Sequence, residues 1–235
     1  MTATLDIRNL EFQRRDGFKL AVPALTVQPG EQVLLAGPSG CGKSTLLLLA
    51  AGLLNVDRGS IRIGGDELVG LGGAARDALR ASRIGMIFQT HHLLPGFSAR
   101  ENVATAMLFA GVPHRDQAVE AGELLSSLGI ERPDARVERQ SVGQQQRIAI
   151  ARALAARPAL ILADEPTASL DPENARIAVE LLQEACRDRG AALLLTSHDP
   201  SLVQAFERRI DFADLASMGG VTTTDHSSDV PEVSA

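Results

Sequence analysis

The amino-acid sequence predicts an α/β fold with a mostly parallel central sheet, an N-terminal antiparallel β subdomain and an inserted helical subdomain. The first observation is a set of four short apolar runs that end in small or polar residues, which is typical of strands buried on both faces. The second is partial alternation of apolar and polar residues near the N-terminus, which is typical of antiparallel strands. The third is helical spacing of apolar residues between the second and third runs.

Length and composition limit the possible classes of protein. The chain has 235 residues, 45% of them hydrophobic and 22% charged, which fits one globular domain with a small subdomain. The formal net charge of -6 argues against nucleic acid as a partner. Cys41 and Cys186 lack the spacing of a metal site or disulfide framework, which favours a reducing compartment. The longest apolar run, residues 45–54, is about half the length that a bilayer requires.

The strands follow in chain order. Residues 5–12, 18–27 and 59–68 alternate in polarity next to or around turn sequences that contain glycine. The four apolar runs lie at 32–37, 83–89, 159–165 and 191–198. Functional side chains of such sheets gather at the carboxyl ends of the strands, so we expect the residues that end these runs to share one site.

Helices are expected between residues 90 and 157, where apolar residues recur at three- and four-residue spacing. The segments are 99–112, 116–130 and 143–157, and prolines punctuate them. We therefore expect a helical subdomain at about 90–157 within a folded domain at 4–215. Residues 216–235 contain little apolar surface to bury, and we expect a flexible acidic tail there.

The segment GPSGCGKST at 37–45 predicts a phosphate-binding loop between an apolar strand and a helix. It fits the pattern G-x-x-x-x-G-K-[ST], in which backbone N–H groups surround a phosphate and the helix N-terminus adds its dipole. Lys43 is expected to reach the β and γ phosphates, and Ser44 to offer its hydroxyl to Mg²⁺. This motif makes the α/β fold a P-loop NTPase. The residues expected to bind ATP are Gly37, Pro38, Ser39, Gly40, Cys41, Gly42, Lys43, Ser44 and Thr45.

Two adjacent carboxylates end the third apolar run in the segment LILADEP at 160–166. Asp164 is expected to hold Mg²⁺, and Glu165 to orient and deprotonate an attacking water. His198 ends the fourth run, where a contact with the γ-phosphate is favoured over a solvated surface histidine. Gln89 ends the second run, where its amide could ligate Mg²⁺ or bind the water; a plain loop glutamine is the alternative.

These motifs, in this order and spacing, resemble the ATP-binding cassette ATPases over residues 4–215. GPSGCGKST is similar to their Walker A, ALILADEP at 159–166 to their Walker B, and the residues 169–171 to their D-loop, with Asp171 as its acidic residue. Gln89 falls at the Q-loop and His198 at the switch histidine. Residues 140–144, the signature segment from here on, fall at the family signature.

The resemblance implies a mechanism and partners. Two cassettes pack head to tail around two ATPs, so that each signature segment completes the site of the other subunit. Hydrolysis then opens the dimer and drives transmembrane permease subunits at the cytoplasmic side of the membrane. The amino-acid sequence of residues 87–103 and 163–171 is most similar to the family branch that includes lipoprotein-releasing and macrolide-export ATPases. This similarity implies a lipidic, lipoprotein or hydrophobic substrate. We expect a homodimer with ATP and Mg²⁺. A catalytically weakened regulatory subunit and a soluble non-transport ATPase are the alternatives.

The signature segment departs from the usual L-S-G-G-Q of the family. It reads Gln140, Ser141, Val142, Gly143 and Gln144. Ser141 can still donate to a γ-phosphate in trans, and Gly143 still allows close approach of the backbone. If position 142 requires a positive φ, valine is strained there by about 1–2 kcal/mol. If φ is negative, the cost is mostly steric.

Three further features of the sequence bear on ligands and partners. The family stacks adenine on an aromatic residue where this chain has Arg14, whose guanidinium can also stack on a base; a solvated Arg14 with loosely held adenine is the alternative. The residues IDFADL at 210–215 lack the usual Asp-Gly turn. Leu93, Leu94 and Phe97 follow Gln89 in an apolar loop, which we interpret as a docking site for the permease, with packing under the helical subdomain as the alternative.

Overall fold

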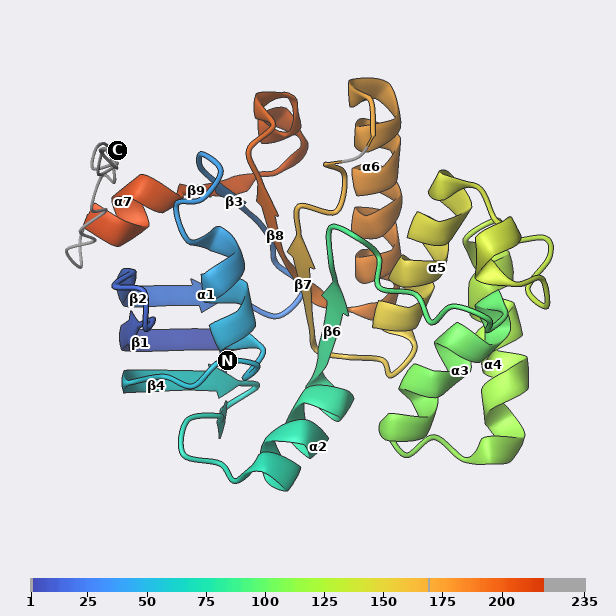
Figure 1. Ribbon diagram of the computed structural model, residues 1–235, viewed down its shortest axis with the longest axis horizontal. Helices are drawn as coiled ribbons and strands as arrows, with labels where there is room; N and C mark the ends of the chain where they lie inside the picture. The colour runs from blue at the N-terminus through green and yellow to red at the C-terminus, as the bar shows by residue number, and fades with distance from the viewer. Residues whose placement is uncertain (1, 169, 218–235) are drawn as a thin grey trace, which may run out of the picture.

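The computed structural model describes residues 2–168 and 170–217 of the chain (Figure 1). Two sheets form the framework. The first is antiparallel, in the order β2-β1-β4-β5, and comprises β1 (Leu5–Gln13), β2 (Lys19–Val27), β4 (Arg58–Ile63) and β5 (Asp66–Glu67). The second is parallel, in the order β6-β7-β8-β3-β9, and comprises β3 (Gln32–Ala36), β6 (Ile84–Ile87), β7 (Leu160–Asp164), β8 (Ala192–Ser197) and β9 (Arg208–Asp211). The predicted fold class is confirmed.

The parallel sheet brings the ends of the four apolar runs to one edge. Ala36, at the end of β3, pairs with Ser197 of β8, and Asp164, at the end of β7, pairs with Thr196 of β8. Every residue of β8 is buried, as the continuous apolar run predicts for a strand covered on both faces. The loops that follow β3, β7 and β8 therefore start side by side.

Helices cover both faces of this sheet (Figure 1). The helices are α1 (Lys43–Ala50), α2 (Gly73–Arg83), α3 (Ala99–Phe109), α4 (His114–Ser127), α5 (Val142–Leu154), α6 (Pro172–Arg189) and α7 (Phe212–Ser217). Two short 3₁₀ helices lie at Val137–Arg139 and Pro200–Ala205. One apolar core packs α1 and the antiparallel sheet against one face of the parallel sheet. A second packs α3, α4, α5 and α6 against the other face of the parallel sheet.

The chain end differs from the Asp-Gly turn that is usual in the family. After β9, residues 212–217 form the short helix α7, which packs against β2. Phe212, the first residue of α7, is buried, with 1% of its surface exposed. The expected tail at 216–235 lies outside the described residues from 218 on, as does Ser169 of the expected D-loop.

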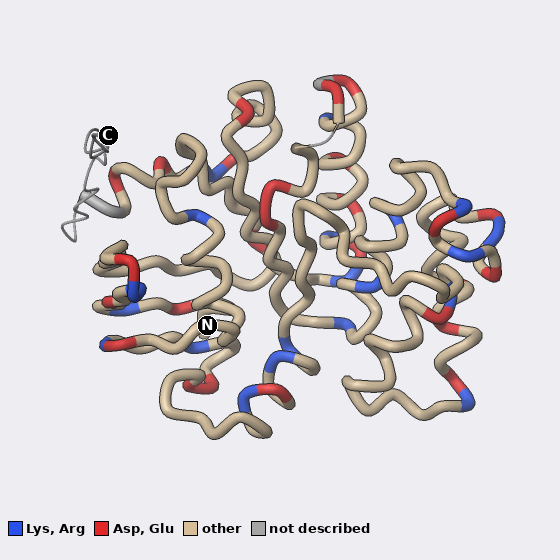
Figure 2. The backbone as a smooth tube through the Cα atoms, viewed as in Figure 1, with Lys and Arg blue, Asp and Glu red and all other residues tan. Residues whose placement is uncertain are grey.

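Within residues 2–168 and 170–217, no helix is long and apolar enough to cross a membrane. Acidic and basic residues alternate along much of the backbone in Figure 2, including along α2, where Arg80 pairs with Asp77 at 2.6 Å.

Candidate functional site

The aromatic rings of Phe18 and Phe212 pack against the phosphate-binding loop at Gly42. Gly42 has φ +116°, and a Cβ there would lie 3.0 Å from the ring of Phe18 and 3.1 Å from that of Phe212. A larger residue would crowd both rings and would also be strained in this left-handed conformation. Phe18 precedes β2 and Phe212 begins α7, so two distant segments shape the loop. α1 begins directly after Gly42, which directs its N-terminus into the loop.

Lys43 occupies the centre of the loop. Its side chain is 3% exposed, and Nζ donates to the carbonyl oxygens of Gly37 and Pro38, each at 2.8 Å. Nζ also lies 3.3 Å from Oε1 of Glu165. The positively charged ammonium group therefore lies within the loop whose backbone N–H groups would bind a phosphate, and it can bind the same phosphate.

Asp164 joins the loop to the sheet. Its Oδ1 accepts a hydrogen bond at 2.9 Å from Ser44 Oγ and another at 2.9 Å from Thr196 Oγ1. The hydroxyl of Ser44 and the carboxylate of Asp164 thus form an oxygen pair next to the phosphate loop. Oxygen donors of this kind suit Mg²⁺, so these residues fit the expected metal.

Glu165 lies between two cationic or potentially cationic groups. Its Oε1 faces Lys43, and its Oε2 lies 2.9 Å from Nδ1 of His198. The backbone of Glu165 has φ 42°, a left-handed conformation that costs about 1–3 kcal/mol for a residue other than glycine. Its N–H donates to Thr196 O at 3.2 Å and Thr196 Oγ1 at 3.1 Å, which holds this turn. The side chain is therefore fixed at the edge of the sheet rather than extended into solvent.

Gln89 lies two residues beyond β6 and its side chain is exposed. The strand directs the following loop toward the same edge of the sheet as β7, its hydrogen-bonded neighbour. The structure thus joins Lys43 to Glu165 and Glu165 to His198, and separately joins Ser44 to Asp164, the residue before Glu165. Gln89 follows the adjacent strand.

The signature segment begins α5, on the other side of the parallel sheet from α1 (Figure 1). Ser141 is the N-cap: its Oγ accepts from Gln144 N at 3.2 Å, and Gln144 Oε1 accepts from Ser141 N at 2.9 Å. This capping box holds the helix start. A site that includes both Ser141 and Lys43 would therefore need the signature segment of a second subunit.

Val142 is not among the residues with positive φ in the described chain, and it is the first residue of α5. Backbone strain at this position is therefore absent. The valine side chain is 53% exposed, and a Cβ at Gly143 would meet open space. Gln140, which replaces an apolar residue, is buried and donates to Arg132 O at 3.1 Å, so it anchors the segment by a hydrogen bond.

Two other predicted site residues have local roles in this structure. Asp171 caps α6 and accepts from Asn174 N at 3.1 Å and from Asn174 Nδ2 at 2.6 Å, which holds the pKa of Asp171 below its ordinary value. Arg14 pairs with Asp16 at 2.7 Å, and its guanidinium lies 5.1 Å from the ring centroid of Phe18. Arg14 therefore covers the aromatic ring that itself touches Gly42.

The apolar loop after Gln89 divides its side chains between core and surface. Leu93 packs against the core, whereas Leu94 and Phe97 are 37% and 45% exposed. Leu94 lines a groove of about 550 Å³, together with Leu53 and Phe109. Phe97 is not among the residues that line this groove. The docking residues named from the sequence thus have three different environments.

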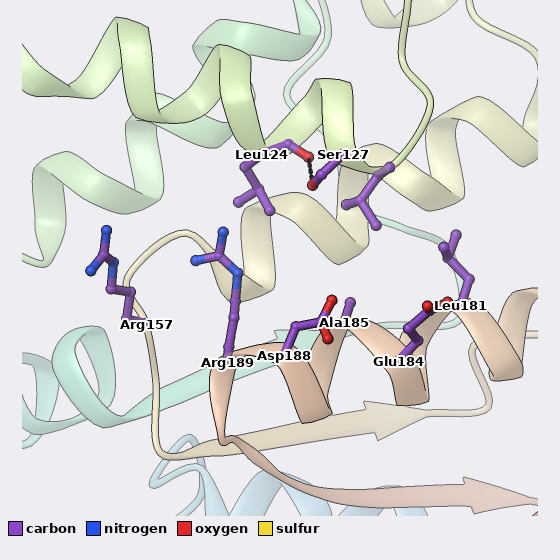
Figure 3. Close-up of a pocket in the computed structure, with 9 residues that line it drawn as sticks. Leu124, Ser127, Arg157, Leu181, Glu184, Ala185, Asp188 and Arg189 are labelled. Atoms are coloured by element: carbon purple, nitrogen blue, oxygen red, sulfur yellow. Dashed lines mark hydrogen bonds between the residues drawn. The ribbon is translucent and has the colours of Figure 1, made fainter.

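A second surface pocket lies between α4 and α6, away from the phosphate loop (Figure 3). Arg157 and Arg189 lie at one end, and the carboxylates of Asp188 and Glu184 follow α6. None of the residues expected to bind ATP lines this pocket.

Sequence reasoning missed Thr196, Phe18 and Phe212 as components of the site. Thr196 is fully buried and contacts both Asp164 and Glu165. A signal was present, because Thr196 is a polar residue within the apolar run 191–198. The two phenylalanines had no such signal, because their role depends on tertiary contact with the loop.

Cys41 gives a direct test of loop access. It is partly exposed in the loop, and a Cβ at Gly37 would lie 3.3 Å from its Sγ. We expect alkylation by N-ethylmaleimide to block ATP binding sterically, measured by equilibrium binding of a fluorescent ATP analogue. Cys186 is fully buried, and burial raises the pKa of its thiol to about 12, so it should remain unmodified near pH 8.

The control for this alkylation experiment is Cys41→Ser, which should become insensitive to the reagent. Normal ATP binding by protein that mass spectrometry shows to be alkylated at Cys41 would contradict the prediction.

Comparisons with known proteins agree with this geometry. The sequence profile of the ABC transporter family matches residues 20–168. The lipoprotein-releasing system ATP-binding protein LolD 1 of Rhodospirillum rubrum is 45% identical over 185 residues, which cover 78% of this chain and 82% of that protein. LolD 2 of Caulobacter vibrioides is 44% identical over 191 residues, which cover 81% and 84%. The dimeric post-hydrolysis structure of the ATP-binding cassette MJ0796 bound to ADP and Pi has a TM-score of 0.76 at 30% identity, covering 88% of this chain and 93% of that one.

The resemblance found in the motifs is therefore confirmed over most of the chain. The fold, the phosphate loop and the profile match all lead to the same class of ATPase. The chain belongs to the ABC transporter family and is an ATP-binding subunit that hydrolyses ATP.

Proposed function

We propose that this chain powers a transmembrane permease that extracts or exports a lipid-anchored protein or another hydrophobic substrate. The observation that carries the motor function is the cluster of Lys43, Ser44, Asp164, Glu165 and His198 at one edge of the sheet. The substrate class is supported by relatives at 44–45% identity that are lipoprotein-releasing system proteins. The subunit would act at the cytoplasmic side of the membrane, held there by its permease.

ATP binding would rearrange the contacts of Lys43. Its ammonium group would exchange Glu165 for the β and γ phosphates, since a phosphate offers more negative charge and several acceptor oxygens. Glu165 would then be free to accept a proton from an attacking water, and His198 would donate to the γ-phosphate. The backbone N–H groups of residues 37–45 would surround the phosphates.

Mg²⁺ would be held by Ser44 and Asp164, with the amide oxygen of Gln89, in the loop after the neighbouring strand β6, as a further ligand. When bound, the ion neutralises charge on the phosphate oxygens. Thr196 would keep Asp164 aimed at this position through its hydrogen bond to Oδ1.

Two copies of the chain would complete each other's sites. Ser141 and Gly143 would approach the γ-phosphate bound by the partner, at the N-terminus of α5. The unstrained helical backbone at Val142 supports a working signature segment. Asp171, at the start of α6, would lie in the D-loop contact between subunits. A regulatory role would gain support only if this half-site failed to close.

Adenine would lie beside the loop near Arg14 and Phe18. The guanidinium over the Phe18 ring offers a flat cationic surface for a base, without any Tyr or Trp in the chain.

The permease would dock in the groove lined by Leu53, Leu94 and Phe109. These side chains are 43%, 37% and 73% exposed, a concentration of apolar surface that is typical of an interaction site. A short amphipathic helix of the permease would fit a groove of this kind.

Replacing Leu94 and Phe109 with serine is expected to abolish co-purification with the permease while ATP binding by the isolated subunit persists. The loss follows from removal of two apolar anchors from the groove. Phe97→Ser is the matched control, because the exposure of Phe97, 45%, lies between those of Leu94 and Phe109, and Phe97 does not line the groove. Unchanged co-purification of the double variant would refute this docking site.

The function as a whole is tested with the subunit and its co-purified permease in liposomes that carry a fluorescent triacylated lipoprotein. ATP with Mg²⁺ should release the lipoprotein into solution, and the unacylated form of the same protein should show no ATP dependence. ATP hydrolysis without release of any acylated protein would rule out a lipid-anchored protein as the substrate.

A further inference from the structure

Arg152 lies in the last turn of α5 and bonds to the loop that follows Gln89. Its Nη2 donates to the carbonyl oxygen of His91 at 2.6 Å, and its Nη1 donates to that of His92. One guanidinium thus binds two consecutive carbonyl groups. The signature segment begins the same helix, eleven residues earlier in the chain at Ser141.

The bound loop has an uncommon backbone. His91 and His92 have φ values of 57° and 47°, two successive left-handed residues that are not glycine. Each such residue costs of order 1–3 kcal/mol unless the surroundings hold it. Here His91 N donates to Phe88 O at 3.0 Å, and the His92 ring stacks on Phe88 with centroids 4.8 Å apart. In this backbone conformation the carbonyl groups of His91 and His92 both face α5, where Arg152 binds them.

A second contact fixes the same end of α5. Gly85, in β6, lies so close to the carbonyl oxygen of Ala153 that a Cβ at position 85 would overlap it. β6 leads to Gln89 within two residues of its end. The helix end is therefore attached both to the strand before Gln89 and to the loop after it.

We propose that Arg152 is a positioning residue that ties the loop after Gln89 to α5, so that Gln89 and Ser141 move as one rigid unit. This inference rests on the proposed roles of those two residues. Helix α5, about 20 Å long, would hold Ser141 at a fixed distance from Gln89. Ser141 would contact the ATP bound by the partner subunit, and Gln89 would lie at the ATP site of its own subunit. Arg152, His92 and Phe88 also line the groove proposed for the permease, so this part of the docking surface belongs to the same unit.

The test compares Arg152→Gln and Arg152→Lys with Arg147→Gln in the purified full chain. Arg147 is the matched control, because it lies on the same helix and donates to the single carbonyl of Leu128 at 3.3 Å. The readouts are kcat and KM for Mg-ATP, and amide hydrogen exchange over residues 88–94 without nucleotide.

We expect Arg152→Gln to lower kcat about tenfold or more with KM changed less than about twofold, since misplacing one group by about 1 Å can cost that much. Exchange over residues 88–94 should accelerate. Arg152→Lys should fall between Gln and wild type, because an ammonium group lacks the two-nitrogen fork. Arg147→Gln should leave exchange over residues 88–94 as in wild type.

Wild-type kcat and wild-type exchange in Arg152→Gln would overturn the proposal. Should that variant fail to fold, Arg152→Lys decides, and wild-type values of both readouts would then overturn it. Absence of hydrolysis in the wild-type chain would instead contradict the proposed function, and the exchange measurement would still test the attachment.

Discussion

Glu165→Gln is expected to lower the kcat of ATP hydrolysis by roughly 10²–10⁴-fold while ATP still binds. The amide keeps the size of the side chain but cannot take a proton from water. The structure holds Glu165 between Lys43 and His198, so the substitution also removes the charge that faces Lys43 in the resting site. Release of Lys43 from this ion pair should leave ATP affinity equal to or higher than that of wild type.

Steady-state hydrolysis and equilibrium ATP binding measure the two halves of this prediction. Glu184→Gln is the matched control, because Glu184 is an exposed glutamate on α6 outside the cluster around Lys43. A Glu165→Gln variant that hydrolyses ATP within about threefold of wild type would show that another group acts as the base.

The same variant also tests Val142. With hydrolysis blocked, Mg-ATP should trap a dimer that analytical ultracentrifugation can detect. The helical backbone at Val142 carries no left-handed strain, so we expect this dimer without further change to the signature segment. If only the double variant Glu165→Gln with Val142→Gly dimerises, the exposed valine obstructs closure and this half-site is impaired.

The sequence was a good guide wherever local pattern determines position. Continuous apolar runs identified β3, β6, β7 and β8 of the parallel sheet, because only buried strands lack polar positions on both faces. The runs did not include β9, whose sequence RRID is only partly buried. The ends of these runs identified Asp164, Glu165 and His198, because neighbouring parallel strands end at a common edge. In the structure, Glu165 contacts His198, and Asp164 contacts Thr196, two residues before His198. Gly42 followed from the loop motif, and its φ of +116° explains the choice of residue.

The sequence was a poor guide where tertiary contact determines the outcome. Nothing in the sequence indicates that Phe18 and Phe212, 194 positions apart, meet behind Gly42. The backbone angle at Val142 depends on where α5 begins, and the motif alone left both signs of φ open. The environments of Leu93, Leu94 and Phe97 differ although all three are apolar neighbours, because only the packed structure separates core from groove.

Lys43→Met is the second substitution with a large expected effect. Methionine keeps the length and apolar stem of the buried side chain and removes the charge. The carbonyls of Gly37 and Pro38 would lose their donor, and leaving such groups unpaired costs about 1–3 kcal/mol of unfolding free energy. Glu165 would lose its cation in the resting state.

The larger consequence concerns nucleotide. Without the ammonium group, the charge that builds up on the transferred phosphate would lack its main side-chain donor, which we expect to lower kcat by about 10²–10³-fold. ATP affinity should also fall, in contrast to Glu165→Gln. This difference separates the two residues by role, because one binds the phosphates and the other handles the proton of the water.

Lys19 provides the control, as the only other lysine in the sequence, exposed at the start of β2. Lys19→Met should retain wild-type affinity and melting temperature, so any shared defect would indicate a general effect of charge removal. If Lys43→Met binds ATP normally and loses only turnover, the phosphates must be held by the backbone N–H groups and helix dipole of the loop. Lys43 would then act only on the transition state, which binding and turnover measured on the same preparation can establish.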